Sequence, residues 1–357
     1  MVEWKKLGEV CCIRTGKLNA NAQVENGKYP FFTCDAKPFR IDTFAFDTEA
    51  ILISGNGSQV GHLNYYKGKF NAYQRTYVID DFRDINVFYL FHYLKSTIRP
   101  YVMDKSKKGS VPYITLPMLE GFIIPIPSLE EQDRIVGILD TFTSAIDNLK
   151  EQIAQRRKQY EYYRDQLLDL EGKPGVEMKT LGDLGDVCMC KRIMKEQTSE
   201  NEEIPFFKIG TFGSQADAFI SRDLFEEYKS KYSYPKKGEI LISASGTIGR
   251  SVVFDGEDAY FQDSNIVWIA NDEKEVTNRY LYYFYQVADW KTDGGTIKRL
   301  YNYNLKNTTI PVPPLSEQSR IVSILDTFEA SITNLEAQLK EREKQYEYYR
   351  NKLLTFE

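Results

Sequence analysis

The chain has very few of the residues from which metal sites and nucleophilic active sites are usually built. Its 357 residues include only two histidines and five cysteines, at positions His62, His92, Cys11, Cys12, Cys34, Cys188 and Cys190. Neither the adjacent cysteine pair nor the Cys-x-Cys pair has zinc-finger spacing. We therefore expect all five cysteines to be reduced, structural thiols, and we expect no metal site.

Familiar catalytic motifs are also absent. The sequence has no Gly-x-x-x-x-Gly-Lys-Ser/Thr loop and no Asn/Asp-Pro-Pro-Tyr motif of adenine methyltransferases. No set of nucleophile, histidine and acid is evident, and the glycines of residues 210–213 do not match a cofactor loop. This pattern predicts a chain without a catalytic site and without a cofactor of its own.

Long apolar runs are missing too. No run approaches the length of a membrane span, and residues 1–6 do not resemble a signal peptide. The apolar content of 42% is enough for real cores, and the length allows two globular domains and a further element. We expect a cytoplasmic protein with no membrane contact.

The chain lacks the excess of positive charge that is typical of nucleic-acid-binding proteins, because its net charge is −5. The charge is unevenly distributed, since residues 1–123 carry 16 basic and 12 acidic side chains. Small basic clusters lie next to Gly and Ser. If the chain binds DNA, this balance predicts weak intrinsic affinity that a partner completes.

A long internal repeat is the strongest feature that the sequence does have. Residues 124–171 align without a gap on residues 310–357, and 29 of the 48 positions are identical. The segments before each copy correspond only faintly, as in the runs Ile51-Leu52-Ile53-Ser54 and Ile240-Leu241-Ile242-Ser243. We therefore predict four parts: a variable domain at 1–123, a helix at 124–172, a second variable domain at 173–309 and a second helix at 310–357.

Each copy of the repeat predicts one long helix with a heptad seam, and Ser128-x-x-Glu131 is a plausible capping box for the first. The apolar positions are spaced alternately by four and three, and an arginine interrupts both seams at the same place. The first seam is Ile135, Leu139, Phe142, Ile146, Leu149, Ile153, Arg156, Tyr160, Tyr163, Leu167 and Leu170. The second seam is Ile321, Leu325, Phe328, Ile332, Leu335, Leu339, Arg342, Tyr346, Tyr349, Leu353 and Phe356.

A helix of this length is roughly 60 Å long and cannot bury such a stripe by itself. Two matching stripes in one chain predict an antiparallel intramolecular coiled coil, which relates the two halves by a pseudo-two-fold axis. The fold class is therefore α+β, with two mixed α/β globular domains joined by two long helices. A coiled coil that forms a homodimer is the alternative.

Several residues off the seam are identical in the two copies although a coiled coil does not need them. Besides Asn148/Asn334, Gln159/Gln345 and Arg164/Arg350, they include six residues that we predict to bind a partner: Glu131, Gln132, Arg134, Glu317, Gln318 and Arg320. A recent duplication would also explain the identity, but the diverged domains argue against it. We infer that one kind of partner docks twice.

The globular segments combine short predicted strands with one helix each, near 85–101 and 276–290. The loops between them have the composition of a nucleic-acid surface, because Gly and Ser let the backbone approach phosphates and Lys and Arg neutralise them. Gln, Asn and Arg also suit base edges. In the first domain the predicted DNA-binding residues are Arg14, Lys17, Asn56, Ser58, Gln59, Gln74, Arg75, Lys105, Lys107, Lys108 and Ser110. In the second they are Lys191, Arg192, Ser245, Thr247, Arg250, Gln262, Asn265, Thr296, Lys298, Arg299 and Asn302.

The helical motifs resemble those of a known family. A Pro-x-Pro exit followed by Leu-x-Glu-Gln-x-Arg-Ile-Val and a heptad helix is similar to the conserved regions of the specificity (S) subunits of type I restriction–modification systems. The motif residues here are Leu129, Glu131, Gln132, Arg134–Val136, Leu315, Glu317, Gln318 and Arg320–Val322. The loops with Gly57-Ser58 and Gly246-Thr247 are similar, more loosely, to a recurring feature of the target-recognition domains of that family.

The resemblance implies that each target-recognition domain reads one half of a bipartite, asymmetric site on double-stranded DNA, and that the helices set the gap between the halves. It further implies that two modification subunits dock on the helices, bind S-adenosylmethionine and methylate a flipped-out adenine in each half-site. Restriction subunits that use ATP and Mg are a further candidate partner. The chain itself would select the site and catalyse nothing.

Three other functions remain open at this point. One is the recognition subunit of a type II (IIB/IIG-like) restriction–modification enzyme. A second is a coiled-coil scaffold that binds no DNA, which the acidic balance favours. A third is a stand-alone methyltransferase, which the missing cofactor motifs disfavour.

Overall fold

The computed structural model describes residues 2–105, 111–294 and 298–356. The chain divides into two compact units, one formed by residues 1–150 and 337–357 and the other by residues 151–336. Each unit holds one globular domain and part of each long helix, α4 (Leu129–Leu168) and α9 (Leu315–Leu354). The four-part division expected from the sequence remains a prediction.

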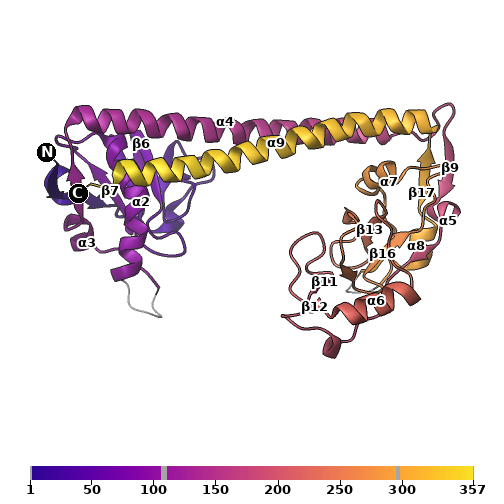
Figure 1. Ribbon diagram of the computed structural model, residues 1–357. Helices are drawn as coiled ribbons and strands as arrows, with labels where there is room; N and C mark the ends of the chain where they lie inside the picture. The colour runs from indigo at the N-terminus through magenta and orange to yellow at the C-terminus, as the bar shows by residue number, and fades with distance from the viewer. Residues whose placement is uncertain (1, 106–110, 295–297, 357) are drawn as a thin grey trace. The chain divides into compact units, whose positions relative to one another are not determined.

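The globular part of the first unit is built around a six-stranded sheet in the order β2-β7-β5-β6-β3-β4. Figure 1 labels strands β6 and β7 of this sheet. Its neighbouring strands are antiparallel except for the parallel pair β3 and β6. The elements are β1 (Glu3–Lys6), α1 (Leu7–Val10), β2 (Cys12–Thr15), the 3-10 turn η1 (Ala20–Ala22), β3 (Tyr29–Phe32), β4 (Phe39–Ile41), β5 (Phe46–Ser54), β6 (Leu63–Ala72), β7 (Thr76–Asp80), α2 (Val87–Lys105), α3 (Leu116–Glu120) and β8 (Ile123–Ile126).

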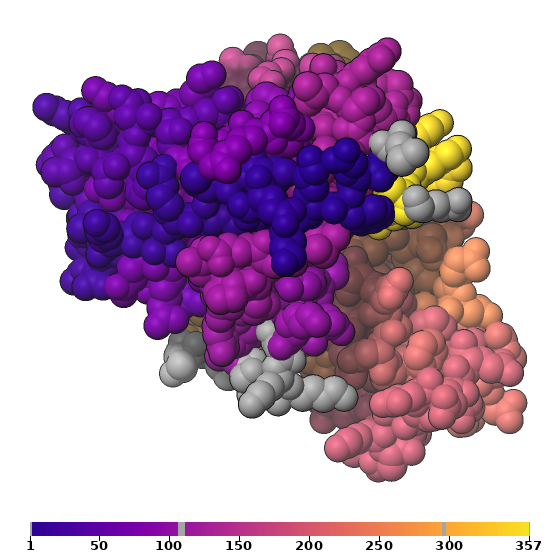
Figure 2. Space-filling model, turned by 90° about the vertical axis from the view of Figure 1, so that its left-hand side faces the viewer, coloured from indigo at the N-terminus to yellow at the C-terminus, as the bar shows by residue number. Residues whose placement is uncertain are grey.

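The N-terminal strand closes the first unit at the point where α4 leaves it. Strand β1 pairs antiparallel with β8, which directly precedes α4. The space-filling view shows the indigo N-terminal residues lying on the surface of this unit beside magenta residues that follow the sheet (Figure 2).

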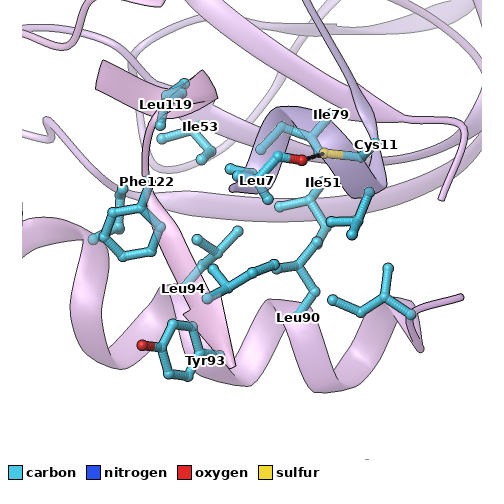
Figure 3. Close-up of a cluster of buried hydrophobic side chains, with 14 of the residues drawn as sticks. Leu7, Cys11, Ile51, Ile53, Ile79, Leu90, Tyr93, Leu94, Leu119 and Phe122 are labelled. Atoms are coloured by element: carbon cyan, nitrogen blue, oxygen red, sulfur yellow. Dashed lines mark hydrogen bonds between the residues drawn. The ribbon is translucent and has the colours of Figure 1, made fainter. Parts of the chain in front are cut away.

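Strand β5 is central to this unit, and its second half, residues 50–54, is buried on both faces, which is why residues 50–53 are a continuous apolar run. Because successive side chains alternate, Ile51 and Ile53 join the core under α2, while Leu52 faces a second cluster with Phe70 and Val78. Figure 3 shows Leu90, Tyr93 and Leu94 of α2 in the first of these cores, around Ile51 and Ile53.

The cysteines are free thiols, as the sequence predicts. Cys11 is buried in the core shown in Figure 3, where its Sγ donates to the Leu7 carbonyl oxygen at 3.0 Å. Burial raises the pKa of Cys11 to about 12, and burial likewise raises the pKa of Cys190 to about 12. Because the thiolate is the reactive form, these two side chains act as small apolar core residues.

The second unit repeats the topology of the first. A four-stranded sheet in the order β10-β16-β13-β14 matches β2-β7-β5-β6, and a three-stranded sheet β12-β11-β15 matches the remaining pairings, including a parallel pair. The elements are β9 (Glu177–Thr180), α5 (Leu181–Leu184), β10 (Val187–Cys188), η2 (Lys195–Gln197), β11 (Ile204–Phe207), β12 (Phe219–Ile220), α6 (Arg222–Lys231), β13 (Ile240–Ser243), β14 (Ser251–Val253), β15 (Tyr260–Phe261), β16 (Ile266–Ile269), α7 (Asn278–Tyr285), α8 (Asn302–Lys306) and β17 (Thr309–Val312).

Two features of the second unit differ from the sequence expectation. Helix α6, which begins after an N-cap hydrogen bond from Leu224 N to Ser221 Oγ, has no predicted counterpart. Helix α7 ends at Tyr285, before the predicted end at Trp290. The chain turns there because the Trp290 indole donates to the Tyr285 carbonyl oxygen at 3.3 Å, a bond that a continuing helix would not allow.

The two long helices run antiparallel, as predicted. In the first unit Phe142 of α4 stacks on Tyr349 of α9 at 5.3 Å, and in the second unit Tyr163 of α4 stacks on Phe328 of α9 at 5.5 Å. Moving forward along α4 from Phe142 to Tyr163 thus corresponds to moving backward along α9 from Tyr349 to Phe328. The arginine that interrupts each seam lies 5.8 Å from the centre of the phenylalanine ring, so that it covers the stack with a cation.

Each domain takes the far end of one helix into its own core. Leu354, at the end of α9, is buried in the core of the first unit with Ile135 of α4. Leu168, at the end of α4, is buried in the core of the second unit with Ile321 of α9. Burying an apolar residue of this size contributes about 1.5 to 3 kcal/mol, so each domain is stabilised by both helices. Within the described ranges, no helix is both long and apolar enough to cross a membrane.

Candidate nucleic-acid interface

In the second unit, several loops meet at one edge shared by the four-stranded and the three-stranded sheet. Strands β10, β11, β13 and β15 end there and β16 begins there, because β13 is antiparallel to β16 and β11 is parallel to β15. Backbone hydrogen bonds join the loops, from Ala244 N to Asn265 O at 2.7 Å and from Leu300 N to Ala244 O at 2.9 Å. The edge brings together most residues predicted to bind DNA in this domain, namely Arg192, Ser245, Thr247, Arg250, Gln262, Asn265 and Arg299, whereas the Lys191 ammonium lies 5.1 Å from the centre of the Tyr232 ring.

A cleft of about 520 Å³ opens at this edge. Its charged lining is mostly basic, with Arg192, Lys195, Lys208 and Arg299 against the single acid Asp263. A concave surface with an excess of positive charge concentrates field lines and attracts phosphate. The cleft is therefore the part of this domain best suited to a nucleic-acid strand.

Hydrogen bonds hold the walls of this cleft in place. Gln262 Oε1 accepts from the Ile209 backbone at 2.9 Å, which fixes the loop after β11. Asn265 Oδ1 accepts from Ser245 Oγ at 2.7 Å and from Arg299 Nη2 at 3.2 Å. Four of the predicted DNA-binding side chains thus shape the site with groups that are already engaged.

The loop after β13 needs glycine for steric reasons. Gly249 has a φ of +81°, and a Cβ there would lie 2.2 Å from the Trp290 indole nitrogen. Gly246 also has a positive φ, of +64°. Arg250 anchors the end of the loop, because its Nη1 donates to the Phe212 carbonyl oxygen at 2.8 Å. The glycines therefore let the loop turn tightly against the domain.

The first unit has a corresponding edge with different side chains. The Cys34 thiol lies 3.0 Å from Asn56 Oδ1, and Gly55 N donates to the Arg75 carbonyl oxygen at 2.9 Å. Gln74 Nε2 donates to Asn19 Oδ1 at 3.0 Å. Exposed side chains on the same loops include three further predicted residues, Lys17, Ser58 and Gln59.

Other predicted residues lie elsewhere or outside the described ranges. Arg14 lies on β2, where it forms an ion pair with the buried Asp80 and covers the Phe46 ring at 5.5 Å. Lys105 is the last residue of α2, Asn302 is the first residue of α8, and Lys298 is exposed next to Arg299. Lys107, Lys108, Ser110 and Thr296 lie outside the described residues.

The structure adds three basic residues that the sequence did not indicate. Lys195 and Lys208 line the cleft of the second unit. In the first unit the Arg99 backbone lies 3.4 Å from the Cβ position of Gly61, so this exposed arginine adjoins the loop after β5. Lys208 directly follows β11, a strand that was not predicted but whose apolar run was a usable signal, whereas Arg99 lies within the helix predicted near 85–101. Within residues 2–105, 111–294 and 298–356, no cluster of three His, Cys, Asp or Glu side chains is placed to hold a metal ion.

The helix surface repeats a charged pair at the same place in both units. Arg134 bonds Glu131 at 2.6 Å in the first, and Arg320 bonds Glu317 at 2.6 Å in the second. The arginine side chains are 53% and 54% exposed, so they are open to a partner. The hydrogen bond from each arginine holds the pKa of its glutamate below the usual value.

The two glutamines that are identical between the copies were predicted to bind a partner, but they are buried. Gln132 and Gln318 are both 0% exposed, which removes their side chains from any surface that a partner could reach. Gln318 Oε1 accepts from Thr277 N at 2.9 Å, and its Nε2 donates to the Glu275 and Pro313 carbonyl oxygens at 2.7 and 2.9 Å. Gln132 likewise accepts from the Asn86 backbone at 2.7 Å. Their identity between the copies is explained by this bond between helix and domain.

We expect Gln318→Ala to destabilise the second unit. The change removes three hydrogen bonds of a buried side chain and leaves a backbone N–H and two carbonyls without their partner, at a cost of about 2 to 4 kcal/mol. Urea unfolding followed by circular dichroism measures the loss. The exposed Gln166→Ala is the matched control and should change stability by less than about 0.5 kcal/mol. Equal effects of the two changes would contradict the role assigned to Gln318.

Beside the charged pair of the second unit lies a groove of about 600 Å³. Its floor is apolar, with Leu167, Ile324 and the stacked rings of Tyr163 and Phe328, and Glu317 and Arg320 stand at its side. The stacked ring pair and the charged pair recur in the first unit as Phe142/Tyr349 and Glu131/Arg134. Exposed aromatic and arginine side chains are the residues most enriched at protein interfaces.

A protein-family model described as "Type I restriction modification DNA specificity domain" matches residues 1–156 and 174–344. The chain is 46% identical to S.HindORF215P, named as a type I restriction enzyme specificity subunit of Haemophilus influenzae, over 99% of this chain and 96% of that protein. It is 30% identical to the EcoR124I/EcoR124II specificity subunit of Escherichia coli, over 99% of this chain and 94% of the relative.

Solved structures share the fold. The S subunit of a type I restriction–modification system from M. genitalium superposes with a TM-score of 0.65 at 17% identity and covers 100% of this chain and 97% of its own. A chain from a structure titled as the complex assembly and conformational transition of the type I system gives a TM-score of 0.61 at 19% identity, with 99% and 96% covered. At these identities the likeness shows the common architecture.

Proposed function

The chain belongs to the family of type I restriction–modification DNA specificity subunits, and we propose that it reads a bipartite, asymmetric DNA site while two modification subunits dock on its helices. Subunits of this family are non-catalytic, and the methyltransferase and endonuclease activities and their cofactors reside in partner subunits. Family membership decides against the scaffold, the type II subunit and the stand-alone methyltransferase.

The proposal that the DNA site has two different halves rests on one observation: the two units share one topology but differ in their loops. Both units present loops at the same sheet edge, but the first exposes Arg75 where the second places Asn265. Two such edges with unlike side chains suit two unlike half-sites. A chain with identical edges would read a palindrome.

The long helices carry the same surface features in both units, which supports the docking of two identical partners. The charged pair and the stacked rings are the same residues in both units, whereas the DNA-facing loops differ. One kind of modification subunit, which brings S-adenosylmethionine, therefore has two equivalent sites. We further propose that restriction subunits using ATP and Mg join this complex, that it acts in the cytoplasm, and that the helices set the gap between half-sites.

The test is DNA selection by the chain with and without its modification subunit. We expect the chain alone to bind duplexes weakly, because its net charge is −5. The complex should select two short fixed sequences separated by a constant gap from a pool in which sequence and gap are random. Gel shifts followed by sequencing of the bound fraction report both. No selection by the complex would contradict the proposal.

A further inference from the structure

Arg192 differs from the other polar residues of the second-unit cleft in how its donors are used. Its Nε donates to Asp263 Oδ2 at 2.9 Å. Asp263 is only 17% exposed and is fixed on the loop before β16, whereas the arginine is 66% exposed at the mouth of the cleft. Among the described residues, neither Nη group of Arg192 has a hydrogen-bond partner.

This geometry orients a planar fork of donors. A carboxylate bonded to Nε orients the guanidinium and leaves its outer edge, formed by one N–H of each Nη group, free to meet a ligand. Of the neighbouring side chains, Gln262 and Asn265 each have their oxygen bonded, and Arg299 donates to Ser264 and Asn265. Lys208 is a point charge that pairs with Asp217 at 2.7 Å.

A preoriented pair of Nη donors matches the two acceptors O6 and N7 on the major-groove edge of guanine, which is the commonest specific arginine contact to DNA. We propose that Arg192 reads a guanine in the half-site of the second unit and that Asp263 is its positioning residue. The proposal rests on the proposed function, because it assigns a base to the site described there.

The first unit has no such pair at the equivalent place. Strands β2 and β10 correspond, because Ile13 pairs with Ile79 in the first unit and Val187 with Ile269 in the second. Counting forward from these strands, the residue that matches Arg192 is Leu18. The guanine contact therefore belongs to one half-site only.

The experiment measures the methylation of a duplex library by the complex of this chain with its modification subunit. The half-site of the second unit is randomised one position at a time, and methylated molecules are sequenced. Arg192→Gln and Arg192→Lys remove the fork, and the lysine variant keeps the charge. Asp263→Asn removes the carboxylate charge at nearly constant size, and Asp263→Glu keeps it. Thermal unfolding of each variant shows whether the domain stays folded.

Arg222→Gln is the matched control. Arg222 Nε also bonds a carboxylate, that of Glu203 at 2.8 Å, but its Nη1 is engaged by Asp258 at 3.1 Å. It follows β12 at the opposite end of β11 from the cleft, because Ile220 pairs with Ile204. Its loss should leave base preference unchanged.

With the unaltered chain we expect one position at which guanine is preferred by roughly 5- to 150-fold. Arg192→Gln and Arg192→Lys should abolish that preference and leave every other position and the other half-site unchanged. Asp263→Asn should weaken the preference, and Asp263→Glu should restore part of it. An unchanged preference in the arginine variants would overturn the inference, and so would a uniform loss of methylation on all sequences, which would make Arg192 a phosphate contact. If the unaltered complex shows no bipartite preference, the proposed function itself fails.

Discussion

Exchanging residues 1–123 for the corresponding domain of a relative with a different recognition sequence is expected to change one half-site and leave the other intact. Among the residues that the structure describes, the loops at the corresponding sheet edge of the first unit come from this segment, and those lining the cleft of the second unit lie between Arg192 and Arg299. Methylation at the original site should fall by roughly 10³-fold or more, the ratio that separates specific from non-specific binding. Methylome sequencing of cells that express the exchanged chain with its modification subunit measures both half-sites.

The structure sets conditions for the exchange. Ile135 and Leu139 of α4 and Leu354 of α9 are buried in the core of the first unit, so the incoming domain must present apolar side chains to them. The bond from the backbone N–H of Asn86 to Gln132 can be made by any residue except proline at that position of the incoming domain. The reciprocal exchange of residues 173–309 is the control and should alter only the other half-site. A change in both half-sites after either exchange would contradict the idea that each domain recognises its own half-site.

The fold was predictable where the sequence is periodic or repeated. The heptad seams predict two long helices, and two stripes in one chain predict their antiparallel pairing, which Phe142/Tyr349 and Tyr163/Phe328 confirm. The seam does not encode which of its tyrosines lie deep, and Tyr163 remains 44% exposed at the edge of its stack. Helix α6 was not predicted, because its ten residues are charged on most sides and carry a single buried residue, Phe225.

The repeat alone could not distinguish the reasons for which a residue is kept. Gln132 and Arg134 are identical to Gln318 and Arg320, yet the glutamines bond a domain internally and the arginines face solvent. The difference arises from backbone groups more than 40 residues away along the chain, as for Gln132 and Asn86. A sequence pattern carries no information about such long-range partners.

The same limit applies to the candidate DNA site. Loop composition located the edge, because Gly, Ser and basic residues cluster after strands that end together. It did not separate groups that build the cleft from groups that are free to read bases. Asn265 looks suited to adenine by its residue type, but its carbonyl oxygen already accepts from Ser245 and Arg299. Only the hydrogen-bond arrangement makes Arg192 stand out.

Reversing the charge of the retained arginines should remove the modification subunits one at a time. Arg134→Glu and Arg320→Glu each alter one of two equivalent surfaces, so each single variant should bind one subunit and the double variant none. Losing one partner of a buried interfacial charge pair costs about 2 to 5 kcal/mol, which weakens binding by roughly 30-fold to several thousand-fold. Size-exclusion chromatography with light scattering distinguishes the three masses.

The fold itself should tolerate the reversal. A glutamate at position 320 would repel Glu317 one turn away, at a cost of about 0.5 kcal/mol, and both arginine side chains are about half exposed. Lys340→Glu, an exposed charge reversal on α9 away from both retained pairs, is the matched control and should bind two subunits. If the single variants lose both subunits together, the two sites are not independent. If the double variant still binds both subunits, the docking surface lies elsewhere on the chain. A subunit that contacts Arg134 or Arg320 would meet a negative charge in place of a positive one and would bind more weakly.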